Sequence, residues 1–459
     1  MFKDIRQNFE DKDNKPIHVI WRDGADPQEY ERARVSRVFN FKIPDRHPQA
    51  IVDVHEESDI VEALKLANQR KSRVCVRAGG HSWPVWSVRD DVILLDLGHY
   101  HETTLDERTG IACISPSTTG LDLNVYLSAR GRMFCPGHCP NVGVGGALLC
   151  GGMGWNCNNT GFACEQIVAV DVVTANGDLV RADARQNADL YWAARGAGPY
   201  FPGIVTRFHV QTRPIPQFMR SSRYIYPMSS YRKAFGWVLN IASEFKGGIE
   251  AVAIGSYPVD MDEAAISINL LAFGEDEADL KKSLKQIDDT HPRGTLARYF
   301  FEETDLNMEY GHKASSYPVH HHYCVDDSFL ESNANVVEVL EKAFMTLPNK
   351  ESLVLWNTMV PQSRRKLPDM ALSIQSDHYF AIYGICKDER DYTLCETWVR
   401  EVMVEVSKHE EGVYLGEFDP QVRWSKIWCK EQAQRLKKII LQRDPDGRFC
   451  DEATLNTVF

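Results

Sequence analysis

Seven glycines lie within the 18 residues from Gly137 to Gly154, and this density constrains the fold more than any other feature of the chain. An ordered glycine costs about 0.5–1 kcal/mol relative to alanine in a regular element, so a cluster of this kind must meet a steric demand. We therefore expect this part of the chain to lie against a large, flat ligand.

A second glycine-rich turn, residues 77–82 with the sequence RAGGHS, directly follows the strand-like residues Val74, Cys75 and Val76. Backbone without β-carbons can present several N–H groups to an anion at close range, so a diphosphate is a candidate guest. A tight turn with an exposed histidine is the alternative. Neither cluster is the G-x-G-x-x-G fingerprint or a Walker A loop, which disfavours a nicotinamide domain or a kinase.

Composition narrows the class of protein further. The 459 residues are 43% hydrophobic, and 52 Lys and Arg against 64 Asp and Glu give a net charge of −12. The basic residues are dispersed, so neither a nucleic-acid nor an anionic-membrane partner is expected. Residues 1–15 alternate in charge, and no run of 18 apolar residues occurs, which predicts a soluble, intracellular protein. The twelve cysteines are too sparse for a disulfide scaffold.

The pattern of apolar residues predicts an α+β chain in three segments: 1–216, 217–409 and 410–459. An Asn-Gly pair at 176–177 predicts a hairpin between strands at 167–174 and 179–182. The second segment is expected to form a sheet backed by helices, and a C-terminal helix at 424–442 is expected to dock on the first segment. The other expected helices are 59–71, 119–129, 231–245, 279–288, 334–346 and 391–408, and the other expected strands are 73–78, 92–97, 223–226, 251–257, 264–273, 353–360 and 379–385.

Six ordered pieces resemble one known family. The segments 77–82, 135–146, 151–155, 167–177, 188–196 and 203–206 are similar to the FAD-binding module of the vanillyl-alcohol oxidase superfamily, and most similar to its berberine-bridge-enzyme-like branch. A weaker match covers 414–449. The resemblance implies a two-part FAD-binding domain (1–216), a substrate domain with an antiparallel sheet backed by helices (217–409), and a segment that returns to the FAD domain (410–459).

The resemblance also implies a covalently attached flavin, with His81 at the 8α position and Cys139 at C6. A glycine nest would favour the thiolate that this chemistry needs, and Cys135 is the rival attachment point. The backbone of one turn is implied to hold the pyrophosphate: Arg77, Ala78, Gly79, Gly80, His81 and Ser82. Residues implied along the flavin are Gly137, Val142, Gly143, Gly145, Gly146, Gly151, Gly152, Gly154, Ile204 and Val205.

Oxidation of an alcohol or amine also requires a base that removes the adjacent proton. Candidates are His378, Tyr379 and Tyr383 on one strand, and Tyr414 or Glu417 in the returning segment. Strand alternation places Tyr379 and Tyr383 on one face and His378 on the other, and we expect the tyrosine face to meet the flavin. His138 is expected either to contact flavin or substrate or to shape the turn. Many relatives have Asn where this chain has Glu417, which predicts a changed substrate contact.

The expected activity is an FAD-dependent oxidase that takes a hydride from a CH–OH donor, a carbohydrate or a small secondary-metabolite alcohol, and returns the electrons to molecular oxygen. Val142 occupies a position that influences oxygen access in the family and favours an oxidase over a dehydrogenase. The alternatives are oxidative cyclisation or C–N oxidation of a specialised metabolite, and a flavin-binding protein without turnover. No metal is expected: consecutive residues of a strand alternate faces, so His320, His321 and His322 cannot easily converge on one ion.

Overall fold

A computed structural model describes residues 17–245 and 247–459. Its first sheet has four strands in the order β1-β2-β4-β3, and β2, β4 and β3 are mutually parallel. Both faces of this sheet are covered, which fits the nearly continuous apolar runs of its strands. The elements are β1 (His18–Trp21), β2 (Ala50–Asp53), β3 (Arg73–Arg77) and β4 (Val92–Asp96), with α1 (Pro27–Val35) and α2 (Glu57–Arg70) between them.

The second sheet is antiparallel, in the order β5-β6-β10-β8-β9. The hairpin predicted at Asn176-Gly177 joins β8 to β9, where Thr174 accepts a hydrogen bond from the Gly177 N–H at 2.9 Å. The strands are β5 (Thr103–Asp106), β6 (Ile111–Ile114), β8 (Ile167–Val173), β9 (Leu179–Asp183) and β10 (Ile204–Gln211). The accompanying elements are α3 (Gly120–Ser128), α4 (Val144–Cys150), α5 (Cys157–Thr160) and α6 (Ala188–Ala193), and a small pair of strands, β7 (Arg132–Met133) and β11 (Arg213–Pro214).

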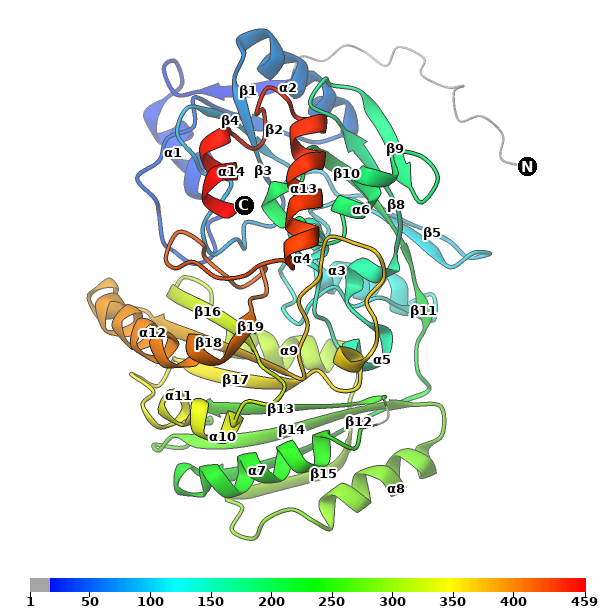
Figure 1. Cartoon of the computed structure of the whole chain (residues 1–459), viewed down its shortest axis with the longest axis vertical. Helices are drawn as coiled ribbons and strands as arrows, with labels where there is room; N and C mark the ends of the chain where they lie inside the picture. Colours follow the sequence, from blue (N-terminus) through cyan, green and yellow to red (C-terminus); the bar gives the residue numbers. More distant parts are fainter. Residues whose placement is uncertain (1–16, 246) are drawn as a thin grey trace.

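The third sheet has eight antiparallel strands in the order β15-β12-β14-β13-β17-β18-β16-β19. Figure 1 shows it below the two smaller sheets, with α7 and α8 on its lower face. The strands are β12 (Phe218–Pro227), β13 (Ile249–Ser256), β14 (Ala265–Gly274), β15 (Ala297–Glu303), β16 (His322–Leu330), β17 (Leu353–Thr358), β18 (His378–Cys386) and β19 (Glu410–Gly412). The helices are α7 (Tyr231–Ala242), α8 (Glu277–Asp288), α10 (Val336–Val339), α11 (Glu341–Met345) and α12 (Tyr392–Val406).

Period-2 alternation divides this sheet into two faces. Phe380 and Ile382 of β18 belong to the core under the helices, whereas Tyr379, Ala381 and Tyr383 belong to the core shared with the two smaller sheets. The sheet is therefore backed by helices on one side and faces the first part of the chain on the other, which confirms the predicted α+β class and antiparallel sheet.

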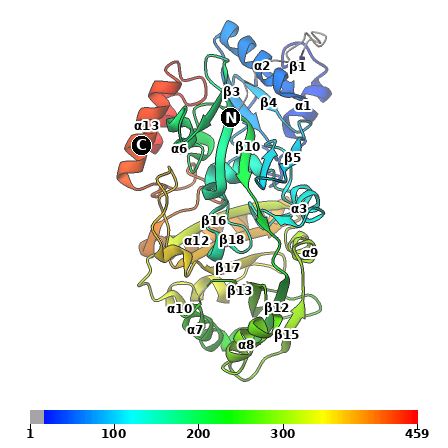
Figure 2. The same ribbon diagram turned by 90° about the vertical axis from the view of Figure 1, so that its right-hand side faces the viewer.

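Three further helices differ from expectation or were not predicted: α9 (Leu306–Ser316), α13 (Lys430–Arg443) and α14 (Glu452–Val458). The helix predicted at 424–442 begins only at Lys430, because the preceding chain is extended and Trp428 donates its Nε1–H to the Gly196 carbonyl at 2.9 Å. The helix predicted at 334–346 is split into α10 and α11. As expected, α13 packs against α6 in the first part of the chain, as Figure 2 also shows.

In the described part of the chain, no helix combines the length and apolar character that crossing a membrane requires.

Candidate active site

The two glycine-rich segments, 64 residues apart in sequence, meet through their backbones. A β-carbon on Gly79 would lie 2.5 Å from the Gly143 nitrogen, and one on Gly143 would lie 2.8 Å from the Gly79 nitrogen. Gly80 has φ +80°, and a β-carbon there would lie 1.8 Å from the Arg37 carbonyl oxygen. Only glycine permits this approach, so the turn after β3 and the loop before α4 form one composite wall.

That wall encloses a cavity of about 1400 Å³ against the open face of the eight-stranded sheet. The volume exceeds the 300–1,000 Å³ of ordinary small-molecule sites, so a dinucleotide and a second molecule fit together. β-carbons at Gly137 and Gly146 would meet nothing within 4 Å and would project into free space, as expected where a ligand approaches the backbone. The predicted flavin residues that line the cavity are Arg77, Ala78, Gly79, Gly80, His81, Ser82, Gly137, Cys139, Val142, Gly143, Gly145, Gly146, Ile204 and Val205.

Three of the predicted flavin residues lie elsewhere: Gly151, Gly152 and Gly154 are not among the described residues that line the cavity. A β-carbon on Gly154 would lie 1.9 Å from the Cys135 carbonyl oxygen. Gly151 and Gly152 have φ values of +124° and +78°. Packing beneath the loop is enough to require glycine at these three positions, so a contact with the ligand stays a prediction.

His81 and Cys139, the predicted attachment points, both line the cavity, whereas Cys135 does not and packs beside Trp155. The His81 ring stacks on Phe39 at a centroid distance of 4.2 Å. Burial, assisted by the charge of Arg37, lowers the pKa of His81 to about 4. The imidazole is therefore neutral at pH 7 and keeps a free lone pair.

Cys139 behaves differently from the expected thiolate. Burial raises the pKa of its thiol to about 12, and the positive charge of Lys313 opposes this shift only in part. The nearby glycine loops do not offset the loss of hydration, so the sulfur is protonated at neutral pH.

The opposite wall carries the candidate base. Tyr383 of β18 points into the cavity and donates its hydroxyl to Glu417 Oε2 at 2.9 Å. Burial raises the pKa of Glu417 to about 7, and hydrogen bonds from Tyr383 and Trp83 and the charge of Lys313 oppose the rise. Glu417 is therefore balanced between its two charge states near neutral pH.

Tyr379 lies on the same face of β18 and also lines the cavity. Its hydroxyl is buried and has no hydrogen-bond partner among the described residues. A buried phenol of this kind normally has a partner, so the free hydroxyl marks a place for a ligand group. His378 lies on the other face, with its ring 5.8 Å from that of Trp356, so it is removed from the candidate bases.

Tyr414 and His138 complete the predicted set, and both line the cavity. The Tyr414 hydroxyl accepts a hydrogen bond from the Gly152 N–H at 3.1 Å, and its own N–H donates to Asp327 Oδ1 at 2.6 Å. Burial lowers the pKa of His138 to about 3, and its ring packs edge-on against Trp155 at 5.1 Å. Tyr414 therefore links Gly152 to Asp327 by hydrogen bonds, and His138 lines the cavity as a neutral imidazole.

The unpredicted lining residues include Lys313 on α9 and Tyr317 directly after it, near the Cys139 loop. Lys313 Nζ lies 5.9 Å from the centre of the Tyr317 ring, and burial lowers the pKa of Lys313. The sequence does contain a signal for the start of α9. Asp305 accepts a hydrogen bond from the Met308 N–H at 2.8 Å, and aspartate is a common residue at the N-cap of a helix.

Glu250 of β13 is a second buried carboxylate at the cavity. Asn158 donates its N–H to Glu250 Oε1 at 3.4 Å, and the Asn158 side chain donates to the Thr358 carbonyl at 3.2 Å. Burial raises the pKa of Glu250 to about 7. These bonds tie residues 156–158 to the large sheet, and Asn158 is buried there.

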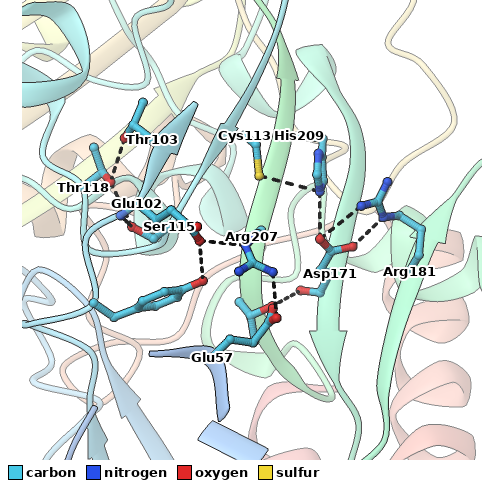
Figure 3. A network of polar contacts seen from close by, with 12 residues as sticks. Glu57, Glu102, Thr103, Cys113, Ser115, Thr118, Asp171, Arg181, Arg207 and His209 are labelled. Carbon is cyan, nitrogen blue, oxygen red and sulfur yellow. Dashed lines mark hydrogen bonds and ion pairs between the residues drawn. The ribbon is translucent and has the colours of Figure 1, made fainter. Parts of the chain in front are cut away.

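A cysteine, a histidine and an aspartate also meet on the five-stranded sheet (Figure 3). His209 Nε2 lies 4.0 Å from Cys113 Sγ and 2.9 Å from Asp171 Oδ2. A nucleophile–base–acid triad needs the two partners on opposite ring nitrogens, but here one nitrogen serves both. Burial also raises the pKa of Cys113 to about 11, so this network has a structural role.

Comparisons with known proteins agree with this geometry. Residues 48–183 match the model of the FAD binding domain family. The FAD-linked oxidoreductase janO of Penicillium janthinellum is 36% identical over 437 residues, which cover 94% of this chain and 97% of that protein. A carbohydrate oxidase of Microdochium nivale is 25% identical over 90% of this chain and 88% of its own length. The fold resembles that of the Physcomitrella patens berberine-bridge-enzyme-like protein 1, with a TM-score of 0.82, 17% identity, and coverage of 95% and 96% of the two chains.

The fold and the composite glycine wall define an FAD-dependent oxidoreductase. More narrowly, the chain belongs to the family of FAD-linked oxidoreductases that includes janO, and it shares its fold with the berberine-bridge-enzyme-like protein.

Proposed function

We propose that the protein is an oxidase with covalently bound FAD that acts on a CH–OH group. The composite glycine wall would hold the flavin, which would supply hydride acceptance from the donor carbon and reduction of molecular oxygen to hydrogen peroxide. The observation that carries the proposal is the Tyr383–Glu417 pair in the same cavity as the composite glycine wall. The similarity to a carbohydrate oxidase supports an alcohol donor.

Glu417 is the proposed base. A carboxylate with a pKa of about 7 combines a substantial ionised fraction with basicity sufficient to accept a hydroxyl proton. Tyr383 holds the carboxylate in place by donating to Oε2, and Lys313 stabilises its ionised form. The free hydroxyl of Tyr379 orients the donor by a hydrogen bond.

His81 and Cys139 are the proposed attachment points, at the 8α and C6 positions. Neutral His81 has the lone pair that such a bond requires, and Cys139 is favoured over Cys135 because it lines the cavity. The Cys139 thiol must lose its proton during attachment, since burial holds its pKa at about 12. An acid-precipitated pellet of wild type should stay yellow, and only the double alanine variant should release all of its flavin; a colourless wild-type pellet contradicts covalent attachment.

Val142 lines the cavity and is proposed to leave a path for oxygen. We expect the reduced wild-type enzyme to reoxidise in air and the Val142→Leu variant, with a larger side chain, to reoxidise more slowly at unchanged flavin content. Stopped-flow absorbance measures both rates. Equal rates in the two proteins contradict a gating role for this residue.

The activity itself is tested by anaerobic bleaching of the yellow spectrum and by peroxide release in air. The donors are sugars, aryl and aliphatic alcohols, and amines of matched shape. We expect alcohols to bleach wild type, Glu417→Gln to bleach at least about 100-fold more slowly, and Glu431→Gln, altered on the surface of α13, to match wild type. Bleaching by amines alone favours C–N oxidation, and bleaching by none favours a flavin-binding protein without turnover.

A further inference from the structure

One straight row of side chains crosses six strands of the large sheet, beginning at Tyr379. The strand register pairs each member directly with the next. All six line the cavity: Tyr379, Asn357, Val252, Asn269, Arg223 and Tyr299. The cavity therefore extends along the sheet well beyond the Tyr383–Glu417 pair.

Strand spacing sets the reach of this row. Adjacent strands lie about 4.8 Å apart, so Asn269, three strands from Tyr379, is about 14 Å away, and Arg223, four strands away, is about 19 Å away. These lengths exceed what a single small alcohol spans. A ligand that contacts both ends of the row must be elongated.

The far end of the row offers hydrogen-bond donors. Asn269 Oδ1 already accepts from the Ser267 hydroxyl at 3.1 Å, which leaves the amide NH₂ free to donate. The Arg223 guanidinium lies 4.7 Å over the centre of the Tyr299 ring, and it has no ion pair or hydrogen bond within residues 17–245 and 247–459. The neighbouring row on one side carries two carboxylates: the register pairs Glu302 with Ser221, Ser221 with Leu271, and Leu271 with Glu250.

The adjacent row on the other side is mostly apolar. Register pairs Ala381 with Leu355, Leu355 with Ile254, and Ile254 with Ser267. Val252 and Ile254 are only partly buried and pack on the main core. They form an apolar surface of the cavity between Glu417 and the donors Asn269 and Arg223. An elongated ligand on this surface would contact carbon along its middle and donors at its end.

We propose that this row is the specificity track for an elongated substrate whose end distant from the reacting carbon carries a carbonyl or carboxylate oxygen. Asn269 and Arg223 bind that oxygen, and Val252 and Ile254 support the apolar body. The orientation of the reacting end at Glu417 rests on the proposed function; the binding of the far end does not.

The test measures binding and turnover separately in the flavin-loaded protein. The probes are linear ω-hydroxy carboxylates of 8, 12 and 16 carbons and the matching alcohols that end in methyl. Dissociation constants come from perturbation of the flavin absorbance, and turnover comes from anaerobic bleaching. The variants are Arg223→Gln, Asn269→Leu and the control Arg213→Gln, which changes an exposed strand arginine outside the cavity.

We expect wild type to bind the 12- or 16-carbon carboxylate about tenfold or more tightly than its methyl-ended partner, since a hydrogen bond to a charged group contributes about 1.5–3 kcal/mol. The 8-carbon pair is too short to show this preference. Arg223→Gln and Asn269→Leu should each reduce it, and Arg213→Gln should not. The proposal is overturned if wild type binds the carboxylate and the methyl-ended probe equally tightly at every chain length. It is also overturned if Arg223→Gln and Asn269→Leu both leave the preference for the carboxylate unchanged.

Loss of the proposed function has a different signature. If none of the probes bleaches the flavin but the carboxylate preference and its loss in the variants are observed, the track stands and the proposed oxidation fails. If the probes bleach the flavin but show no carboxylate preference, the oxidation stands and the track fails.

Discussion

Glu417 links the geometry of the site to its dependence on pH. Because burial raises its pKa to about 7, the protonated form dominates below pH 7 and cannot act as a base. We expect kcat/KM to rise about tenfold per pH unit below pH 7 and to level off above it. A pH profile with a sugar or alcohol donor measures this limb.

The Tyr383→Phe variant tests whether Glu417 is the group whose titration causes the rise of kcat/KM with pH. The hydrogen bond from Tyr383 stabilises the ionised carboxylate, so its removal should raise the pKa of Glu417 and move the limb to higher pH. A limb that stays in place, or that moves to lower pH, contradicts the assignment of Glu417 as the titrating group.

Glu250 makes a prediction about stability. Its pKa rises from 4.5 to about 7 on folding, so the folded state holds its proton more tightly than the unfolded state. The resulting stabilisation is complete below pH 4.5 and is lost as pH rises through about 7. Glu250→Gln keeps an acceptor oxygen but does not titrate. Between pH 4.5 and 8, the free energy of unfolding of this variant should therefore rise by on the order of 3 kcal/mol relative to that of wild type.

Denaturant midpoints of the two proteins at both pH values measure the effect of Glu250. Glu417 titrates in both proteins, so its contribution cancels in the difference. A difference that does not change with pH would mean that Glu250 keeps an ordinary pKa in the folded protein.

At the scale of elements, the flavin wall depends on contact between two loops rather than on either loop alone. Gly79→Ala places a β-carbon 2.5 Å from the Gly143 nitrogen, so the loops must separate. We expect the variant to retain less than about a tenth of the wild-type flavin, because both loops line the same cavity. The ratio of absorbance at 450 nm to that at 280 nm reports flavin content.

Gly236→Ala is the matched control for that substitution. Its β-carbon would meet nothing within 4 Å, and Gly236 lies inside α7, so alanine should stabilise the helix by about 0.5–1 kcal/mol. Equal flavin content in the Gly79→Ala variant and this control would show that the loop contact is dispensable.

Local patterns predicted the elements that carry a strong periodic signal. The alternation of β18, the Asn-Gly hairpin and the docking of α13 follow from side-chain period, turn chemistry and an amphipathic face. The pairing of Tyr383 with Glu417 could not be predicted, because it joins residues 34 positions apart on different elements. The raised pKa of Cys139 could not be predicted either, since it depends on burial and not on the local glycine sequence.

The remaining misses have a common cause. Lys313 was overlooked because a polar residue of α9 looks solvated until the large sheet is placed beneath it. For Gly151, Gly152 and Gly154 the sequence could not show the packing contacts that also require glycine at these positions. Tertiary contacts decide both cases.

At the scale of the whole molecule, a backbone hydrogen bond joins the returning segment to β3, the edge strand of the first sheet. The Arg448 carbonyl accepts from the Val74 N–H of β3 at 2.8 Å, and Asp444 accepts from the N–H groups of Arg448, Phe449 and Cys450. Asp444→Ala should free three buried donors and lower stability by about 2–4 kcal/mol. Thermal unfolding of apo protein and flavin retention should both show the loss.

Asp446→Ala is the matched control. It alters an exposed aspartate in the same turn that has no side-chain hydrogen bond in the described part of the chain. Similar losses in both variants would mean that the turn, rather than the carboxylate of Asp444, holds the segment in place.

Phe449, Cys450 and Thr454 line the same cavity as the turn at 77–82, which is synthesised some 370 residues earlier. The wall of the cofactor chamber is therefore built from residues that lie far apart in the sequence, and a chain without residues 449–454 lacks part of it. Flavin supplied to a truncated chain that ends before residue 449 should consequently exchange more freely than flavin bound to the whole chain.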